Sequence, residues 1–399
     1  MMSASPFTET STSGRANGFD ELSAAGPVQK VTLFTGVPVW VITGYAEARQ
    51  VLTDPNVVRS FTEGPHADHV SDELRRAMNS HMLALNPPEH TRLRKLVSAA
   101  FTRRRVEELE PRIAEISAGL LDHMAELGKD GTPVDLVAEY GYPLPITVIS
   151  ELIGVPQLQR DEFRRLTALT LSGPLHTPEE YVAGAWEMVH YIRSLIEEKR
   201  ANPGDDLLSA MIAVRDEGDR LTGDELTSMV FVLLVAGHET TVNLITNGTY
   251  TLLTHPDQLA KMRADATLIP AAVEEVLRFD PPVMTTLPAH TIGPVHIGQT
   301  TIPAGEVVLP AVWSANRDLS RFADPDTFDI TREDKSHVGF GHGIHHCLGA
   351  PLARLEGRIA FRDLFGRFPD LRLADPGEDA GRTISLVLNG IPRLNLVTG

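Results

Sequence analysis

The sequence predicts a mainly α-helical protein with small β-sheets, in which one long helix crosses a single large domain. Three observations lead to this fold class. Nearly every hydrophobic pattern between about Tyr45 and Pro270 has helical spacing, while strand-like runs are short and lie towards the two ends of the chain. The pattern from Thr222 to about His255 is apolar on all sides in its middle, as in a helix surrounded by core. At 1.5 Å per residue, this helix would be about 48 Å long.

Length and composition favour one domain of unusual size. The chain has 399 residues, of which 42% are hydrophobic, enough to bury a large core. Such a length often means two or three domains, but the interior contains no repeat and no linker rich in Pro, Gly or Ser. Residues 26–399 are therefore expected to form a single domain. Residues 1–25 are rich in Ser, Thr and Gly, and we expect them to be disordered.

The charge of the chain excludes several classes of partner. The formal net charge is −17 at pH 7, whereas proteins that bind nucleic acids or anionic membranes usually present a basic surface. The first residues show neither the basic region nor the apolar stretch of a secretory signal. The longest apolar run, Met229–Gly237, has nine residues, whereas a transmembrane helix needs about 20. We expect a cytoplasmic protein with no nucleic-acid or membrane partner.

Local signals place the individual elements in chain order. The long helix and the one before it each begin at a capping box, Thr222 with Glu225 and Thr177 with Glu180. The full set of predicted elements is a hairpin of Val31–Phe34 and Val39–Ile42, helices over Pro111–Leu127, Pro178–Arg200, Gly223–Thr254, Pro270–Phe279 and Ala350–Phe368, and strands over Val295–Ile297, Thr300–Ile302 and Glu306–Leu309.

The single cysteine, Cys347, lies in a glycine-rich segment just before a predicted helix. One cysteine cannot form an intrachain disulfide or a four-cysteine metal site, and a lone cysteine is usually a small buried hydrophobe. Here Gly341, Gly343 and Gly349 favour a tight loop whose backbone lies flat against a neighbour. The helix that follows places the sulfur near a helix N-terminus, where the partial positive charge favours a thiolate. A thiolate can bind a soft metal centre such as haem iron.

The ten residues from Phe340 to Gly349 read Phe-Gly-His-Gly-Ile-His-His-Cys-Leu-Gly. This segment resembles the haem-binding loop of the cytochrome P450 family, Phe-Gly-x-Gly-x-His-x-Cys-Leu-Gly, at every fixed position. The resemblance extends from about Val39 to Gly399 and is closest to soluble actinobacterial members. It implies the cytochrome P450 fold, haem b as the cofactor and Cys347 as the axial ligand of the haem iron. The other haem contacts that it implies in this loop are Phe340, Gly341, His345 and Gly349, with His345 facing a propionate.

The middle of the long helix, Ala236–Thr241, carries an acid and two hydroxyls among apolar residues. Such groups cost free energy unless they have partners, and Gly237 is a poor helix former. We therefore predict a local opening of the helix, where a small molecule could approach the backbone. The segment resembles the oxygen-binding kink of the same family. This implies that Ala236 and Gly237 contact the haem, and that Glu239 and Thr240 are the catalytic pair that delivers protons. The alternative for Glu239 is a structural acid paired with His238.

Glu275 and Arg278 are three residues apart on a predicted helix and share one face. By itself the pair would be assigned to a solvated surface. The segment resembles the Glu-x-x-Arg helix of the family, which implies a buried structural ion pair. The family adds a third basic residue downstream, at a position where this chain has Thr327. Arg332 is the candidate to replace it.

Haem propionates need donors, and the resemblance implies several. His90 and Arg94, which by themselves read as an ordinary basic helix start, match the family helix that binds the propionates, and His345 would be a third donor. A further arginine of the family corresponds to Ala289 here. Strand alternation turns adjacent side chains to opposite faces. We predict that His290 faces the haem edge and donates instead, or that water and His345 cover the missing donor.

The resemblance implies a haem-thiolate monooxygenase that hydroxylates or epoxidises an apolar small molecule with one atom of O2. Members of this subgroup act on polyketides, macrolides, terpenoids and steroids. We expect a monomer that receives electrons from NAD(P)H through a ferredoxin reductase and a ferredoxin, because no flavin or pyridine-nucleotide domain is present in the sequence. The implied substrate-pocket residues are Leu85, Val235, Val283, Met284, Leu287 and Leu388, with the segments Phe61–Leu85 and Leu171–His176. A basic cluster for docking an acidic ferredoxin is expected from Arg92, Arg94, Lys95 and Arg103–Arg105.

Three alternatives remain at this point. A peroxide-driven peroxygenase would replace the acid–alcohol pair, which this chain keeps as Glu239 and Thr240. A non-enzymatic haem protein that stores, senses or carries electrons would not need a proton relay in its core helix. The last alternative is a zinc site, with ligands from His342, His345, His346 and Cys347, although their spacing matches no closed zinc pattern.

Overall fold

The computed structural model describes residues 6–60, 67–98, 101–155, 165–167, 169–170, 176–216 and 221–399. The chain divides into two compact units, each made of separate stretches of sequence. The first comprises Met1–Val58, Val106–Pro145 and Glu239–Gly399, and the second Arg59–Arg105 and Ile146–His238. The single-domain organisation of residues 26–399 stays a prediction.

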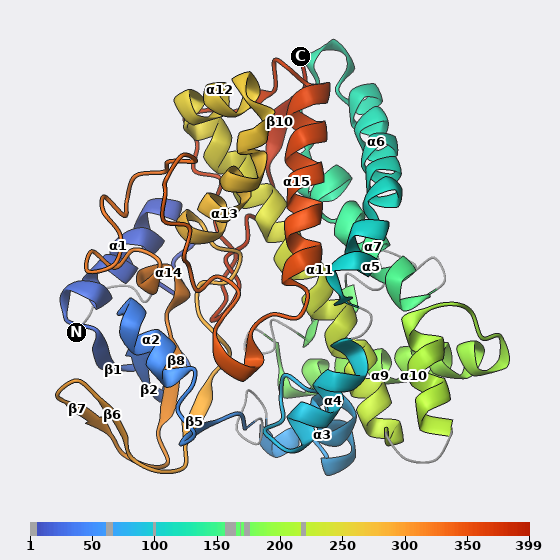
Figure 1. Ribbon diagram of the computed structural model, residues 1–399, viewed down its shortest axis with the longest axis vertical. Helices are drawn as coiled ribbons and strands as arrows, with labels where there is room; N and C mark the ends of the chain where they lie inside the picture. The colour runs from blue at the N-terminus through green and yellow to red at the C-terminus, as the bar shows by residue number, and fades with distance from the viewer. Residues whose placement is uncertain are drawn as a thin grey trace. The chain divides into compact units, whose positions relative to one another are not determined.

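The first unit contains all the strands that the structure describes and most of the long helices (Figure 1). Its helices are α1 (Thr12–Ala24), α2 (Tyr45–Val51), α6 (Glu110–Leu127), α12 (Pro256–Ala264), α13 (Ile269–Phe279), α14 (Val312–Ala315) and α15 (Ala350–Arg367), with short helical turns η3 (Lys129–Gly131), η4 (Val137–Gly141), η6 (Ala266–Leu268) and η7 (Gly343–His345). The helix α15 packs against α6 and α13.

Three small sheets belong to this unit. The largest has the strand order β1-β2-β8-β5-β3, in which β2 and β8 are parallel and the other neighbours antiparallel. Its strands are β1 (Val28–Thr32), β2 (Pro38–Ile42), β8 (Val307–Pro310), β5 (Ala289–Thr291) and β3 (Val57–Val58). The other sheets are β4 (Val134–Asp135) with β10 (Asn395–Val397) and β9 (Arg372–Leu373), and the pair β6 (Val295–Ile297) with β7 (Thr300–Ile302).

All the regular elements that the structure describes in the second unit are helices. It contains η1 (Ala67–His69), α3 (Asp72–Asn79), α4 (Glu89–Ser98), α9 (Pro178–Ala201) and α10 (Leu207–Asp216). The helix α9 packs against α3 and α10. Three helices include residues of both units, namely α5 (Arg103–Glu108), α7 (Pro143–Ile153) and α11 (Gly223–Thr254).

The predicted fold class is confirmed, and so are the predicted elements, with small shifts at their ends. Both capping boxes form. In the pair Thr177 and Glu180, each side chain accepts a hydrogen bond from the backbone N–H of the other residue, and the same holds for Thr222 and Glu225. The helix α11 is long and apolar enough to cross a membrane, but 72% of its apolar stretch is buried inside the protein. This burial is that of a core helix, and its composition alone is weak evidence for a membrane span.

The expected disorder of residues 1–25 is wrong for the part that the structure describes. Residues 12–24 form α1, which the side chain of Ser11 caps by accepting a hydrogen bond from the backbone N–H of Gly14. Phe7 and Phe19 are buried, and Phe19 stacks on Trp313 with 5.7 Å between ring centres. A few large apolar side chains in a polar segment therefore anchor it to the core, which average composition does not reveal.

Candidate functional site

The loop before α15 holds Cys347 by its backbone. The Cys347 N–H donates to the carbonyl of Phe340 at 2.9 Å, and α15 begins three residues later, at Ala350. Gly341 and Gly343 have φ of 72° and 73°, the left-handed region that favours glycine. A Cβ on Gly343 would also lie 2.5 Å from the carbonyl oxygen of Leu52. The sequence thus builds a tight loop that leaves the cysteine exposed beside a helix N-terminus.

A half-buried acid, an arginine and a histidine lie beside this loop. Arg354 donates from Nε and Nη2 to the two carboxylate oxygens of Glu274, at 2.6 and 2.9 Å, and His337 contacts the same carboxylate at 3.1 Å. Burial alone would raise the pKa of Glu274, but the hydrogen bonds from Arg354 and His337 lower it to about 2. The Arg354 guanidinium lies 4.5 Å from the ring centre of Phe340. These contacts fix the aromatic side of the loop and place positive charge near Cys347.

The donor set fits haem better than a bare metal ion. Among the residues that the structure describes, no group of three or more His, Cys, Asp or Glu side chains could hold an ion, so a closed zinc site around Cys347 is not supported. A single exposed thiolate fits a metal that brings most of its ligands with it, as haem iron does. The flat glycine backbone around Cys347 suits the face of a planar cofactor.

The predicted oxygen-binding segment lies in α11. Ala236 and Gly237 belong to the second unit, and Glu239 and Thr240, both half-buried, belong to the first. The helix is α-helical at every residue from Gly223 to Thr254, so the expected local opening is not seen. Packing explains the glycine instead, because a Cβ on Gly237 would lie 2.7 Å from the side chain of Ile149 in α7.

The predicted propionate donors of the second unit share α4. His90 is buried and Arg94, one turn later, is half-buried. Of the expected basic cluster, Lys95 and Arg105 are exposed, while Arg92 forms an ion pair with Glu225 and so contributes less free charge. The side chain of Arg103 lies outside the described residues. Leu85 is half-buried and Val235 is buried.

The predicted buried ion pair is confirmed, with its third member. Arg278 binds Glu275 on the inside of α13, and its Nη1 donates to the carbonyls of Asn316 and Pro325 at 3.0 and 2.7 Å. Arg332 Nε lies 3.3 Å from Glu275 Oε1. Arg332 therefore fills the position that Thr327 leaves open in the resemblance.

The strand β5 separates Ala289 from His290 as alternation requires. Ala289 is buried in a hydrophobic cluster with Ile42 and Val308, whereas His290 is half-buried on the opposite face. Whether His290 faces a propionate stays a prediction.

Two of the predicted pocket segments lie side by side. Val283 and Leu388 form an antiparallel bridge, and both side chains are half-buried, as is that of Leu287. The expectation for Met284 is wrong, because it is fully buried in a core cluster with Phe7. Met284 packs into that core cluster, whereas its neighbour Val283, which forms the bridge, is half-buried. Parts of the other two segments, residues 61–66 and 171–175, lie outside the described residues.

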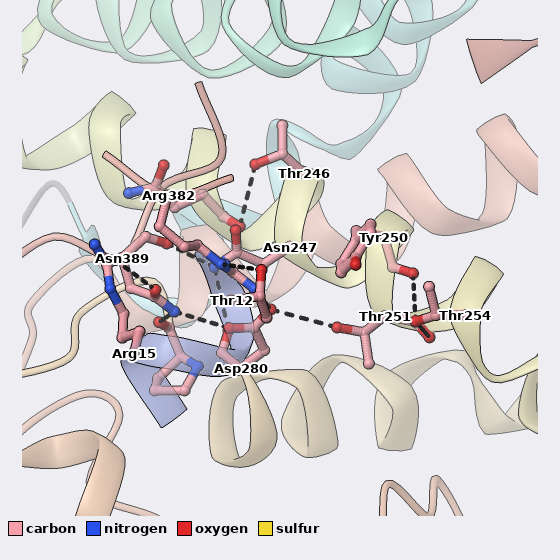
Figure 2. Close-up of polar contacts among 12 residues, drawn as sticks. Thr12, Arg15, Thr246, Asn247, Tyr250, Thr251, Thr254, Asp280, Arg382 and Asn389 are labelled. Atoms are coloured by element: carbon pink, nitrogen blue, oxygen red, sulfur yellow. Dashed lines mark hydrogen bonds and ion pairs between the residues drawn. The ribbon is translucent and has the colours of Figure 1, made fainter. Parts of the chain in front are cut away.

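Two buried polar features escaped sequence reasoning. The first is a cluster formed by Arg15, Asp280, Arg382 and Asn389 (Figure 2). The second is Glu356 in α15, which is 1% exposed, and whose Oε2 has no hydrogen-bond partner among the described residues. Burial raises the pKa of Glu356 well above its ordinary value. Neither has a local signal, because burial of a charged residue depends on tertiary packing.

Comparisons with known proteins agree with this geometry. A family model described as "Cytochrome P450" matches residues 179–376. The chain is 48% identical to Cytochrome P450 107B1 of Saccharopolyspora erythraea over 94% of its own length and 92% of that protein. It is 45% identical to 6-deoxyerythronolide B hydroxylase of the same organism over 94% of each chain. The solved structure of the tirandamycin C-bound P450 monooxygenase TamI superposes with a TM-score of 0.87 at 42% identity, covering 96% of this chain and 97% of that one.

Proposed function

Because this chain belongs to the cytochrome P450 family and is a haem-thiolate monooxygenase, we propose that it hydroxylates or epoxidises a macrolide or a related polyketide. Haem, when bound, supplies the chemistry of O2 activation. The observation that carries the assignment is the Cys347 loop, an exposed thiol beside a helix N-terminus. The substrate class rests on the relatives, one named for 6-deoxyerythronolide B and another solved with tirandamycin C bound.

In the first unit, we assign Cys347 as the axial ligand, with Phe340, Gly341 and Gly349 against the cofactor and His345 as a propionate donor. The helix N-terminus behind the sulfur favours the thiolate form. The Arg354–Glu274 pair holds Phe340 in place from outside the loop.

His90 and Arg94 of α4 are assigned as further propionate donors in the second unit, and Ala236 and Gly237 as haem contacts. His290 of β5 is assigned the place of the family arginine that Ala289 cannot fill. Hydrogen bonds from charged donors to carboxylates are the strong kind, so such donors would retain the cofactor.

Glu239 and Thr240 are assigned to proton delivery. A carboxylate can take a proton from solvent and pass it on, and a hydroxyl can both accept and donate one. Thr240 would hold the proton at its Oγ1, next to the reacting oxygen, and Glu239 would replenish it. By this route the two side chains would pass protons in a fixed order from solvent to the Oγ1 atom of Thr240.

The enzyme uses small-molecule substrates and external redox partners, as bacterial members of the family do. We assign these partners as a ferredoxin and its NAD(P)H-dependent reductase. Exposed Lys95 and Arg105 offer cations to an acidic ferredoxin. We further propose that the protein is cytoplasmic and monomeric.

The test combines binding with oxygen labelling. The haem-loaded enzyme is screened against macrolides, linear polyketides, terpenoids and steroids for the spin-state change that follows displacement of iron-bound water. Each hit is then turned over with surrogate ferredoxin and reductase under 18O2. The proposal expects a macrolide or polyketide product with one 18O atom. Products from peroxide alone would favour the peroxygenase, and no turnover of any hit would favour a non-enzymatic haem protein.

A further inference from the structure

Arg15 of α1 joins the N-terminal segment to Thr383 and Asn389 near the other end of the chain. It is fully buried, and its Nη1 donates to Asn389 Oδ1 at 3.1 Å. Its Nη2 donates to the carbonyls of Glu9 and Thr383 at 2.8 and 2.7 Å. The residues that it joins lie up to 374 positions away in the sequence. Figure 2 shows Arg15 and Asn389 side by side within the cluster.

Asn389 is held at every polar group. Its Nδ2 donates to Asp280 Oδ1 at 2.8 Å and to the carbonyl of Pro281 at 2.9 Å. Its N–H donates to the carbonyl of Pro282 at 2.9 Å, and its carbonyl accepts from Asn247 Nδ2 of α11 at 2.7 Å. The Oδ1 atom, which Arg15 binds, completes the set. A side chain so fully bonded has one permitted position.

The cluster buries two cations, Arg15 and Arg382. Arg382 forms a buried ion pair with Asp280 at 2.8 Å, which leaves Arg15 as a second buried cation near the same carboxylate. Burial and the charge of Arg382 lower the pKa of Arg15 to about 10, so it stays charged at neutral pH. A buried cation that binds mostly carbonyl and amide oxygens costs desolvation energy. In this cluster the contact of Arg15 fixes the side-chain oxygen of Asn389.

The residue next to Asn389 is Leu388, whose backbone bridges to Val283. Asn389 and Met284 are fully buried, whereas the bridged Val283 and Leu388 are half-buried. The backbone ties the two segments, since the Met284 N–H donates to the carbonyl of Val387 at 2.8 Å. The polar cluster therefore holds in place the backbone that carries Val283 and Leu388. The two side chains together form a small apolar wall.

We propose that Arg15 is a positioning residue for Leu388: it acts through Asn389 and thereby sets the size of ligand that the wall of Val283 and Leu388 admits. This rests on the proposed function, in which that wall faces the substrate. The N-terminal helix α1 then influences substrate selectivity, although it supplies no group that touches the substrate.

The test uses two ligands of the haem iron that differ in bulk. Imidazole reaches only the iron, whereas clotrimazole also fills the surrounding space with aromatic rings. Arg15→Met is expected to leave the dissociation constant of imidazole within twofold and to change that of clotrimazole at least tenfold. Lys30→Met is the matched control, since Lys30 is an exposed cation of the same unit, and neither constant is expected to change. Equal changes for both ligands, or none, would overturn the proposal.

A double-mutant cycle separates positioning from general loss of stability. If Arg15 acts through Leu388, Arg15→Met has little further effect on clotrimazole binding once Leu388→Ala is present. Additive effects would contradict the proposal.

Amide hydrogen exchange tests directly whether Arg15 holds the Leu388 segment in place, and its readout does not depend on ligand binding to the haem. Segment 386–389 is expected to exchange at least tenfold faster in Arg15→Met than in the wild type. A wild-type protein that binds neither azole would refute the proposed function, while unchanged exchange would refute the positioning role. Arg15→Lys, which keeps the charge, is the second variant if Arg15→Met does not fold, and it is expected to give the same changes to a smaller extent.

Discussion

Arg278 donates hydrogen bonds to both carboxylate oxygens of Glu275 inside the protein, from Nε to Oε2 at 2.9 Å and from Nη2 to Oε1 at 2.7 Å. Both side chains are almost fully buried. Removing one partner of such a pair leaves an uncompensated charge, which costs about 3–5 kcal/mol.

We therefore expect Arg278→Met to lower the free energy of unfolding of the haem-loaded protein by about 3–5 kcal/mol in chemical denaturation. Arg112 and Glu115 are the matched control, because they have the same spacing but are exposed. Arg112→Met is expected to change stability by no more than about 1 kcal/mol. Equal effects of the two substitutions would mean that burial does not determine the importance of the Glu275 pair.

Removal of the buried charge of Glu356 is expected to stabilise the protein, whereas removal of Arg278 destabilises it. Its pKa is raised by burial, so its contribution to stability is full below the ordinary value of 4.5 and is lost as pH rises towards the folded-state pKa. Glu356→Gln keeps the shape and removes this loss. We expect the variant to melt at a higher temperature than the wild type at pH 8 and at the same temperature near pH 4. A lower melting temperature at pH 8 would show that the ionised carboxylate is stabilised by something else. Glu126→Gln, at an exposed position, is the control.

Thr240→Ala tests the proton-delivery assignment. The variant is expected to consume NAD(P)H and O2 while releasing most of the reducing equivalents as hydrogen peroxide, because protons would no longer be directed to one oxygen atom. The measurement is the ratio of product to NAD(P)H consumed. Thr241→Ala, at the adjacent buried threonine, is expected to keep the wild-type ratio. If Thr240→Ala also keeps it, another hydroxyl supplies the proton.

Electron transfer is expected to depend on salt. Exposed charges are screened over about 10 Å at 0.1 M ionic strength, so reduction of the enzyme by an acidic ferredoxin should slow as salt is added. Lys95→Gln is expected to slow reduction at low salt and to flatten this dependence, whereas Arg92→Gln has a smaller effect because Glu225 already pairs with Arg92. Single-turnover reduction measured by stopped flow decides this. A rate independent of salt would exclude electrostatic docking.

Local sequence patterns predicted the elements and the cysteine loop well. The capping residues Thr177 and Thr222 act within one turn of their own helix, and the loop around Cys347 is a continuous motif. The i,i+3 spacing of Glu275 and Arg278 predicts that they pair on one helix face, but their burial was implied only by the resemblance. The role of Arg332 could be predicted only from the resemblance, because Thr327 stands where the family has an arginine.

Long-range packing decided what the sequence could not predict. Arg15 lies in a polar segment whose composition resembles disorder, and its partner Asn389 is at the other end of the chain. Met284 is apolar and adjacent to Val283, and only its contacts with the core cluster around Phe7 distinguish the buried residue from the half-buried one. Gly237 was read as a weak point of a helix, whereas its role in the structure is close packing against Ile149. In each case the deciding contact comes from another element.

The spectrum of the reduced, carbon-monoxide-bound protein tests the central claim most directly. A thiolate ligand gives a red-shifted absorption band, so the wild-type protein is expected to show this band, and Cys347→His is expected to bind haem without it. Arg354→Lys, which leaves the cysteine in place, should retain the band. A wild-type protein without the red-shifted band, or a Cys347→His variant that keeps it, would contradict the assignment of Cys347 as the iron ligand.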